Sequence, residues 1–479
     1  MAMRRAAIPL AFVLAGGCTD EVVVAPVIDS PTGDADADAF SGLERIEIAI
    51  AHDGDDVDLV SQSFLRGQAL AIPGAPFGDD LVIHLRGFVG TSQVAYGRTC
   101  AFAVDADGAR VPPHVFFSRT QKFAGTDLVP VARDGGRAVS FLGSGLFLGG
   151  SHAGVATRQI ERFDPVTGEL LQVARVSERT GAVEALIGTS PPRVVLIGGA
   201  VDGAGADFVE LIDPNRLERP VDDYPDARLA RIDLTATSLT DGRVIAIGGA
   251  PPAGAPVGTI TEVALTGGIP DVRDLRAVLA RARQGHTATR LGDDVGAPVL
   301  IAGGTDSANA PVAIAELFKP LSEELANPAT FAPVMIVPRS RHAAALMPDG
   351  SVLVIGGVDA ANAPVRTLEL FSVDAGFESV GELPMTAGII DSTVTRLPDG
   401  RILIAGGRTS VGGPAIDTAF IARLDPLDGS VDVVPTDRLG VARAGHQAAT
   451  LCDGTILVTG GAGDGVTAER YNPPDAGRR

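Results

Sequence analysis

The sequence contains no tryptophan, few other aromatic residues (Phe, Trp and Tyr total 4%), two lysines and three cysteines. Without indole rings, a site that stacks sugars or nucleobases lacks its most effective residue. With only Lys122 and Lys319, few candidates exist for Schiff-base chemistry. The three cysteines Cys18, Cys100 and Cys452 are too few for a disulfide framework, which excludes a small disulfide-stapled fold.

Positive charge is also scarce, because 39 Lys and Arg residues stand against 59 Asp and Glu residues. The net charge of -20 repels phosphate backbones and anionic lipid headgroups, so nucleic acid is excluded as a partner. Glycine (59) and proline (33) are abundant instead, and they separate short apolar runs. This pattern predicts many short strands joined by tight turns.

The N-terminus has the form of an export signal. Arg4 and Arg5 precede the apolar run AAIPLAFVLA, and Ala15, two glycines and Cys18 follow it. This arrangement resembles a bacterial lipobox, although Ala15 stands where leucine is usual. The resemblance implies that residues 1–18 are a lipoprotein signal peptide and that lipidated Cys18 anchors the mature chain in the cell envelope, on the periplasmic or the surface side of the outer membrane. Ordinary signal cleavage and a fortuitous apolar start are the alternatives.

Two further segments precede the repeats described below. Residues 19–40 are predicted to be a solvated acidic linker, since the Asp34–Asp38 run has no apolar face and lacks the glycine and closing glutamate of a calcium loop. Residues 41–119 alternate polar and apolar side chains and predict a small β-sandwich-like domain, immunoglobulin-like or transthyretin-like. Its expected strands are 45–50, 81–89, 93–104 and 114–117. Cys100, inside the third of these, is expected to be a buried, small apolar residue.

Residues 120–479 repeat one pattern seven times, an apolar run that ends in two glycines. The first glycines are 49 to 55 residues apart, a period found in propeller repeats. We expect these positions to need a positive φ or a close backbone approach that excludes a side chain. They are Gly149, Gly150, Gly198, Gly199, Gly248, Gly249, Gly303, Gly304, Gly356, Gly357, Gly406, Gly407, Gly460 and Gly461.

Other features keep register with the diglycine. An Asp-Gly turn precedes the apolar run in four units, and a strand opening with Arg-x-x-His precedes the turn in three, as at Arg339 and His342. A Glu-containing strand and a fourth strand follow. Each unit therefore predicts a four-stranded antiparallel sheet, with strands A to D. The last unit ends after strand C, and residues 127–132 (DLVPVA) are predicted to supply its strand D and close the ring.

These motifs resemble those of kelch-repeat proteins over about three quarters of the chain. The resemblance implies an all-β fold, a seven-bladed kelch-type β-propeller preceded by the small sandwich-like domain. The sequence departs from the family in strand D, where tryptophan is usual and this chain has none.

The repeated ionisable residues are interpreted as structural. His286, His342 and His446 occupy equivalent positions in different units, so they are spread around the ring and do not predict a metal site. The arginines at 231, 283, 339 and 443 are expected to pair with the strand C glutamate, because unit six lacks the arginine, histidine and glutamate together.

The sequence predicts no catalytic or metal-binding residue and no cofactor. Galactose-oxidase-like kelch enzymes bind copper through tyrosines and histidines. Tyr96, Tyr224 and Tyr471, the three tyrosines of this chain, cannot build that site. A carbohydrate-active kelch enzyme such as a sialate mutarotase remains the alternative function, since it has no strict motif.

The B–C and D–A loops share one rim of the predicted ring, and the B–C loops vary most between units. Variable loops on a rigid scaffold are common recognition sites, so a non-catalytic binding or scaffold lipoprotein is the favoured function. A protein partner is expected there and a glycan is possible; the membrane is contacted only through the lipid anchor. The candidate rim residues are Arg341, Arg408, Asp306, Asp359 and Thr409.

Overall fold

The computed structural model describes residues 21–31, 38–55, 57–70, 73–216, 220–461 and 467–473, so Cys18 and most of the aspartate run lie outside the described residues. The described chain consists almost entirely of antiparallel strands, with a short 3-10 helix at Ala227–Leu229. The predicted all-β class is confirmed. No helix in the described part of the chain is long and apolar enough to cross a membrane.

Seven four-stranded antiparallel sheets occupy the described residues from 122 onward. We number them in chain order. Sheet 1 contains β12 (Arg137–Phe141), β13 (Ser144–Leu148), β16 (Gln159–Asp164) and β17 (Glu169–Arg175). Sheet 2 contains β18 (Val183–Ile187), β19 (Arg193–Ile197), β22 (Phe208–Ile212) and β23 (Val221–Pro225). Sheet 3 contains β24 (Thr235–Ser238), β25 (Val244–Ile247), β26 (Thr259–Thr266) and β27 (Ile269–Val278).

Sheet 4 contains β28 (Thr287–Arg290), β29 (Val299–Ala302), β30 (Glu316–Lys319) and β31 (Glu324–Leu325). Sheet 5 contains β32 (Ala343–Leu346), β33 (Val352–Ile355), β34 (Thr367–Ser372) and β35 (Gly376–Glu382). Sheet 6 contains β36 (Thr393–Arg396), β37 (Ile402–Ala405), β38 (Ala419–Leu424) and β39 (Val431–Pro435). Sheet 7 contains β40 (Gln447–Thr450), β41 (Ile456–Thr459), β42 (Ala468–Asn472) and β11 (Lys122–Gly125). Two short hairpins, β14 (Ser151–His152) with β15 (Val155–Ala156) and β20 (Ala200–Val201) with β21 (Ala204–Gly205), extend B–C loops.

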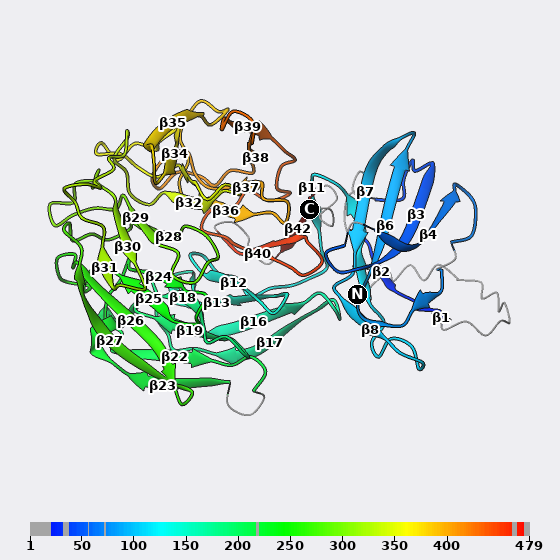
Figure 1. Ribbon diagram of the computed structural model, residues 1–479, viewed down its shortest axis with the longest axis horizontal. Coiled ribbons are helices and arrows are strands. Elements are labelled where there is room, and N and C mark those ends of the chain that lie inside the picture. The colour runs from blue at the N-terminus through cyan, green and yellow to red at the C-terminus, as the bar shows by residue number, and fades with distance from the viewer. Residues whose placement is uncertain are drawn as a thin grey trace.

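The sheets form a closed ring, an arrangement compatible with a β-propeller (Figure 1). The first strand of each sheet contacts the first strand of the next, and β40 of sheet 7 contacts β12 of sheet 1. The second strand of every sheet is buried along its whole length, apart from the half-buried Arg193 that begins β19, because neighbouring sheets cover both of its faces. This explains why these strands are continuous apolar runs such as VLVI and not alternating ones.

An N-terminal strand completes sheet 7, but it is not the predicted segment 127–132. Residues 122–125, and not 127–132, pair with β42 in an antiparallel register. Phe123 packs on Tyr471 there, with ring centroids 4.9 Å apart. The segment 127–132 contains Pro130, which has no N–H to donate to a ladder, and it runs instead toward sheet 1, where Val131 donates its N–H to Glu161.

Residues before 120 form a separate six-stranded antiparallel sheet beside the ring (Figure 1). Its strands are β3 (Arg45–His52), β4 (Asp58–Leu65), β6 (Gly78–Val89), β7 (Ser92–Arg98), β8 (Phe102–Val104) and β10 (Ser118–Arg119). The expected strand 93–104 is interrupted at Thr99–Ala101, and the expected strand 114–117 is β9 (His114–Phe116), which pairs in parallel with β2 (Val27–Asp29).

The structure differs from the expected linker at residues 21–31. β1 (Glu21–Val22) pairs with β5 (Ala75–Pro76), β2 pairs with β9, and Val24 is buried in the core of the N-terminal sheet. The apolar residues of this segment cover one face of the sheet, and their burial favours an ordered chain over a solvated one.

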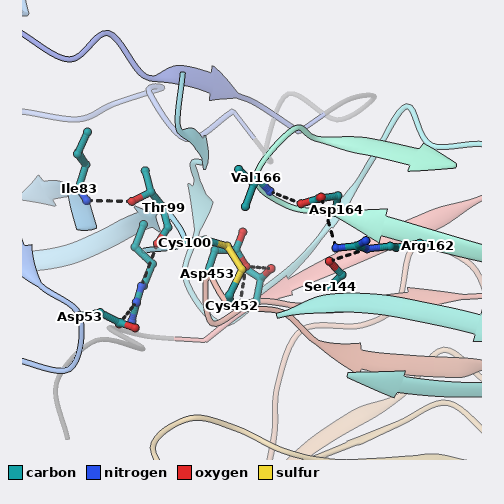
Figure 2. The surroundings of a disulfide bond; sticks show 12 residues. Asp53, Ile83, Thr99, Cys100, Ser144, Arg162, Asp164, Val166, Cys452 and Asp453 are labelled. Carbon is teal, nitrogen blue, oxygen red and sulfur yellow. Dashed lines mark hydrogen bonds and ion pairs between the residues drawn. A yellow bond between two sulfur atoms is a disulfide. The ribbon is translucent and has the colours of Figure 1, made fainter. Parts of the chain in front are cut away.

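Cys100 is buried as expected, but it is not a free thiol. It forms a disulfide with Cys452, which lies in the turn between β40 and β41, with the two Cα atoms 5.1 Å apart (Figure 2). The two cysteines are 352 residues apart in sequence, and no sequence motif pairs them. The bond joins the N-terminal sheet to sheet 7, and the Asn472 side-chain amide adds hydrogen bonds to Tyr96 O and Ser118 O.

Candidate functional site

Buried arginines hold the end of the second strand at the rim of the ring. The guanidinium of each of six arginines donates to the carbonyl of the first glycine of its own sheet's diglycine: Arg133, Arg179, Arg231, Arg283, Arg339 and Arg443. Sheet 6 has Ile389 at this position. The diglycine conformation is as expected, since both glycines have positive φ. A Cβ on Gly304 would lie 2.6 Å from Gln284 O.

The predicted arginine–glutamate ion pairs are confirmed in three of the four units named, at Arg283–Glu316, Arg339–Glu369 and Arg443–Glu469. Sheets 1 and 2 contain the same pair, Arg133–Glu161 and Arg179–Glu210. Each glutamate also accepts hydrogen bonds from backbone N–H groups, as Glu369 does from Ile336 and Val337. A buried carboxylate needs several donors, so these pairs fix the D–A segment against strand C.

The expectation for Arg231 is wrong. Its partner is Thr261 Oγ1, at 3.0 Å, and that hydroxyl donates to Asp274 Oδ1 at 2.7 Å. Burial without a directly bonded carboxylate lowers the pKa of Arg231 to about 10, although the charge of Asp274 opposes this effect. The strand C glutamate of sheet 3, Glu262, pairs with Arg243 and Arg273 instead.

The histidines form contacts between sheets, which supports their structural interpretation. His286, His342 and His446 are buried, and their Nε2 atoms lie 3.1, 2.9 and 2.8 Å from the hydroxyls of Thr235, Thr287 and Thr393 in the preceding sheet. Burial, with a smaller effect of the nearby arginine, lowers the pKa of each histidine to about 3. They are therefore neutral at physiological pH. Among the described residues no group of three or more His, Cys, Asp or Glu side chains could hold a metal ion.

A second ring of residues lies in the D–A loops, at the mouth of the ring of sheets. Each of these residues is two positions after an arginine position. All seven have left-handed backbone conformations: Gly135, Gly181, Asp233, Gly285, Arg341, Asp391 and Gly445. Several are hydrogen-bonded to one another across the boundaries between neighbouring sheets, which we call seams. Gly285 N donates to Asp233 O, and Arg341 N donates to Gly285 O. Four are glycines, for which this conformation carries no steric penalty. Asp233, Arg341 and Asp391 adopt this conformation at a steric cost, and strained residues of this kind cluster at functional sites.

The structure brings two of the predicted rim residues together. Arg341 Nη2 donates to Asp391 Oδ1 at 2.8 Å, and Arg408 Nε lies 3.6 Å from Asp391 Oδ2. Arg341 comes from the loop before sheet 5, while Asp391 and Arg408 come from sheet 6. The Arg341 side chain is 45% exposed, as expected, but Arg408 is only 19% exposed because it also donates to Gly413 O.

Among the other predicted rim residues, the two aspartates form hydrogen bonds within their own loops. Asp306 Oδ1 accepts hydrogen bonds from the N–H groups of Ala308 and Ala310, and Asp359 Oδ1 does the same for Ala361 and Ala363. These carboxylates shape their own B–C loops and are thereby partly withdrawn from binding. Thr409 is half-buried beside Arg408.

The N-terminal sheet lies against the opposite side of the ring. Cys452 lies in an A–B turn and Gly168 in a C–D turn, where a Cβ would contact His114. In an antiparallel sheet these turns lie at the opposite end from the B–C and D–A loops. The contacts of the described residues therefore leave the rim around Arg341 uncovered.

Asp391 was not predicted as a site residue, although the sequence contains a signal. Alignment of the seven units places it at a position held by glycine in four of them, and a repeated glycine indicates a backbone position with positive φ.

Comparison with protein families and with curated proteins finds no match. Among solved structures, the chain is similar to one described as "Structure of YjhT". The TM-score is 0.43 at 10% sequence identity, covering 72% of this chain and 94% of that chain. A similarity of this strength carries no argument about function.

Proposed function

We propose that this chain is a seven-bladed propeller of the kelch type, anchored through Cys18 in a bacterial envelope, and that it binds a protein partner through its rim. Seven ringed sheets and the repeated diglycine support the blade assignment. A disulfide favours an oxidising compartment, and thus supports export.

The convergence of Arg341 and Arg408 on Asp391 carries the proposal. Three charged side chains from two sheets meet at the uncovered mouth, and one of the arginines is nearly half exposed. Partly exposed arginines held by a rigid backbone are frequent energetic centres of protein interfaces, because little side-chain entropy remains to be lost. The N-terminal sheet lies on the opposite side, so an anchor at Cys18 leaves this rim free to meet a partner.

Crosslinking capture from native cell envelope tests the proposal, with soluble residues 19–479 as bait. The test variant combines Arg341→Gly with Arg408→Ala. Glycine at 341 matches four of the seven equivalent positions and therefore suits the backbone. The matched control is Arg290→Ala, which removes an arginine of a surface ion pair on the opposite face.

We expect one envelope protein to be captured by the wild type and the control, and lost with the rim variant. Equal capture by all three baits would overturn the rim assignment, and the absence of any captured protein would overturn the binding function.

A further inference from the structure

The seams between neighbouring sheets can be compared at equivalent positions. At each seam we compare the residue four positions after the arginine position with the residues three and five positions after the arginine position of the following sheet. At the seams of sheets 3/4, 4/5 and 6/7 this set is threonine, histidine and alanine. At the seam of sheets 1/2 it is Arg137, Ala182 and Glu184, so a charged pair replaces the threonine–histidine contact.

Arg137 and Glu184 are placed close together but are not fully bonded. Arg137 Nε donates to Ala182 O at 3.1 Å and lies 3.7 Å from Glu184 Oε2. The Arg137 side chain is 45% exposed, whereas that of Glu184 is 19% exposed. Within the described residues, no side chain donates a hydrogen bond to the Glu184 carboxylate, and the two Nη atoms of Arg137 donate to no acceptor.

Space is open beside this pair. At the seam of sheets 4/5, a Cβ on Gly303 would lie 2.5 Å from the His342 ring. The equivalent glycine at the seam of sheets 1/2 is Gly149, where a Cβ would meet nothing within 4 Å. The small Ala182 stands at the histidine position, which explains the gap.

Burial raises the pKa of Glu184 to about 7, and the positive charge of Arg137 only partly opposes this. β19 presents Leu196 opposite Glu184, and β24 (Thr235–Ser238) has no charged residue, so Arg137 is the charged group that faces it from the neighbouring described strands. Near neutral pH, a large share of Glu184 is protonated and can donate a hydrogen bond. Carboxylates of ordinary surface sites cannot do this.

We propose that the seam between sheets 1 and 2 is a binding site for a small carboxylate ligand, held by the two Nη groups of Arg137 and by the carboxyl group of Glu184. A guanidinium fork matches the two oxygens of a carboxylate, and the carboxylic acid supplies a further donor. The gap beside Gly149 receives the rest of the ligand. This site does not depend on the proposed protein partner, and its residues are distinct from Arg341, Asp391 and Arg408.

The test is titration with D-glucuronate, with D-glucose as its neutral counterpart, followed by ligand-observed NMR and calorimetry at pH 6 and pH 8. We expect saturable glucuronate binding that is at least tenfold tighter than glucose binding and about tenfold weaker at pH 8 than at pH 6. Arg137→Ala should weaken glucuronate binding at least tenfold. Arg396→Ala, an exposed arginine on the inner strand of sheet 6, should not change it.

Glu184→Gln keeps a donor that does not titrate, so its binding should remain and lose its pH dependence. Circular dichroism checks that each variant is folded, and Arg137→Lys replaces Arg137→Ala if the latter is not. The proposal is overturned if glucuronate and glucose bind alike, if the Arg137 variants bind as the wild type does, or if the pH dependence persists in Glu184→Gln.

Discussion

His342 Nε2 lies 2.9 Å from Thr287 Oγ1, across the seam between sheets 5 and 4. The same contact recurs at His286 and His446, so three neutral imidazoles join neighbouring sheets near the mouth of the ring. Charge on any of these rings would have to be buried without a counter-ion, which couples the stability of the ring to pH.

The pKa of each of these histidines is lowered to about 3 in the folded chain, against about 6.5 when unfolded. The unfolded chain therefore binds more protons below pH 6.5. The contribution of each buried, neutral histidine to the free energy of unfolding is complete above pH 6.5 and is lost as the pH falls toward 3. We expect His342→Gln to cost about 1–2 kcal/mol at pH 7.5 and less at pH 4.5, measured by urea unfolding. The exposed His152→Gln is the control, and a cost for His342→Gln that is unchanged at pH 4.5 would contradict this account.

Glu369→Ala leaves the fully buried Arg339 without its carboxylate partner. An unpaired buried charge costs about 3–5 kcal/mol, so this variant should lose that much unfolding free energy in denaturant titrations. Glu382→Ala in the same sheet removes the exposed partner of Arg366 and should change stability by less than about 1 kcal/mol. Similar losses of unfolding free energy for both variants would show that the buried Arg339–Glu369 pair stabilises the fold no more than an exposed ion pair does.

The Cys100–Cys452 disulfide makes the ring closure covalent, because it links the segment before sheet 1 to sheet 7. A Cys100→Ser, Cys452→Ser double variant should lose about 2–5 kcal/mol of stability. The wild type treated with a reductant should melt at the temperature of this variant, while the variant itself should not respond to the reductant. If the reductant also lowered the melting temperature of the variant, the change could not be attributed to the Cys100–Cys452 bond.

Arg341→Gly should preserve the fold, because glycine occupies four of the seven equivalent left-handed positions. Relief of backbone strain offsets the lost ion pair to Asp391 and the greater entropy of the unfolded chain, so we expect a stability change within about 1 kcal/mol. Thermal melting measures this. A loss above about 2 kcal/mol would mean that Arg341 serves the fold, and the capture experiment would then need Arg341→Lys.

The repeat pattern was sufficient to predict the fold class, the position of the buried strands and three of the five arginine–glutamate pairs. Each unit carries the signal for these features in its own residues, because the motif repeats in every unit that has it. The different partner of Arg231 was not predicted, because Thr261 and Asp274 together take the place of one glutamate. Comparing the units one position at a time does not detect a replacement that involves two residues.

The sequence by itself determined that the chain builds repeated antiparallel sheets that end at a diglycine, since local periodicity and turn chemistry fix each unit. Only the tertiary structure decided which strand closes sheet 7, that Cys100 meets Cys452, and that Asp391 draws Arg341 and Arg408 together. It also decided that Arg137 and Glu184 share a seam beside an open gap. These pairings join residues from different units or from the two ends of the chain, and their formation depends on how the ring curves and closes, which no local pattern encodes.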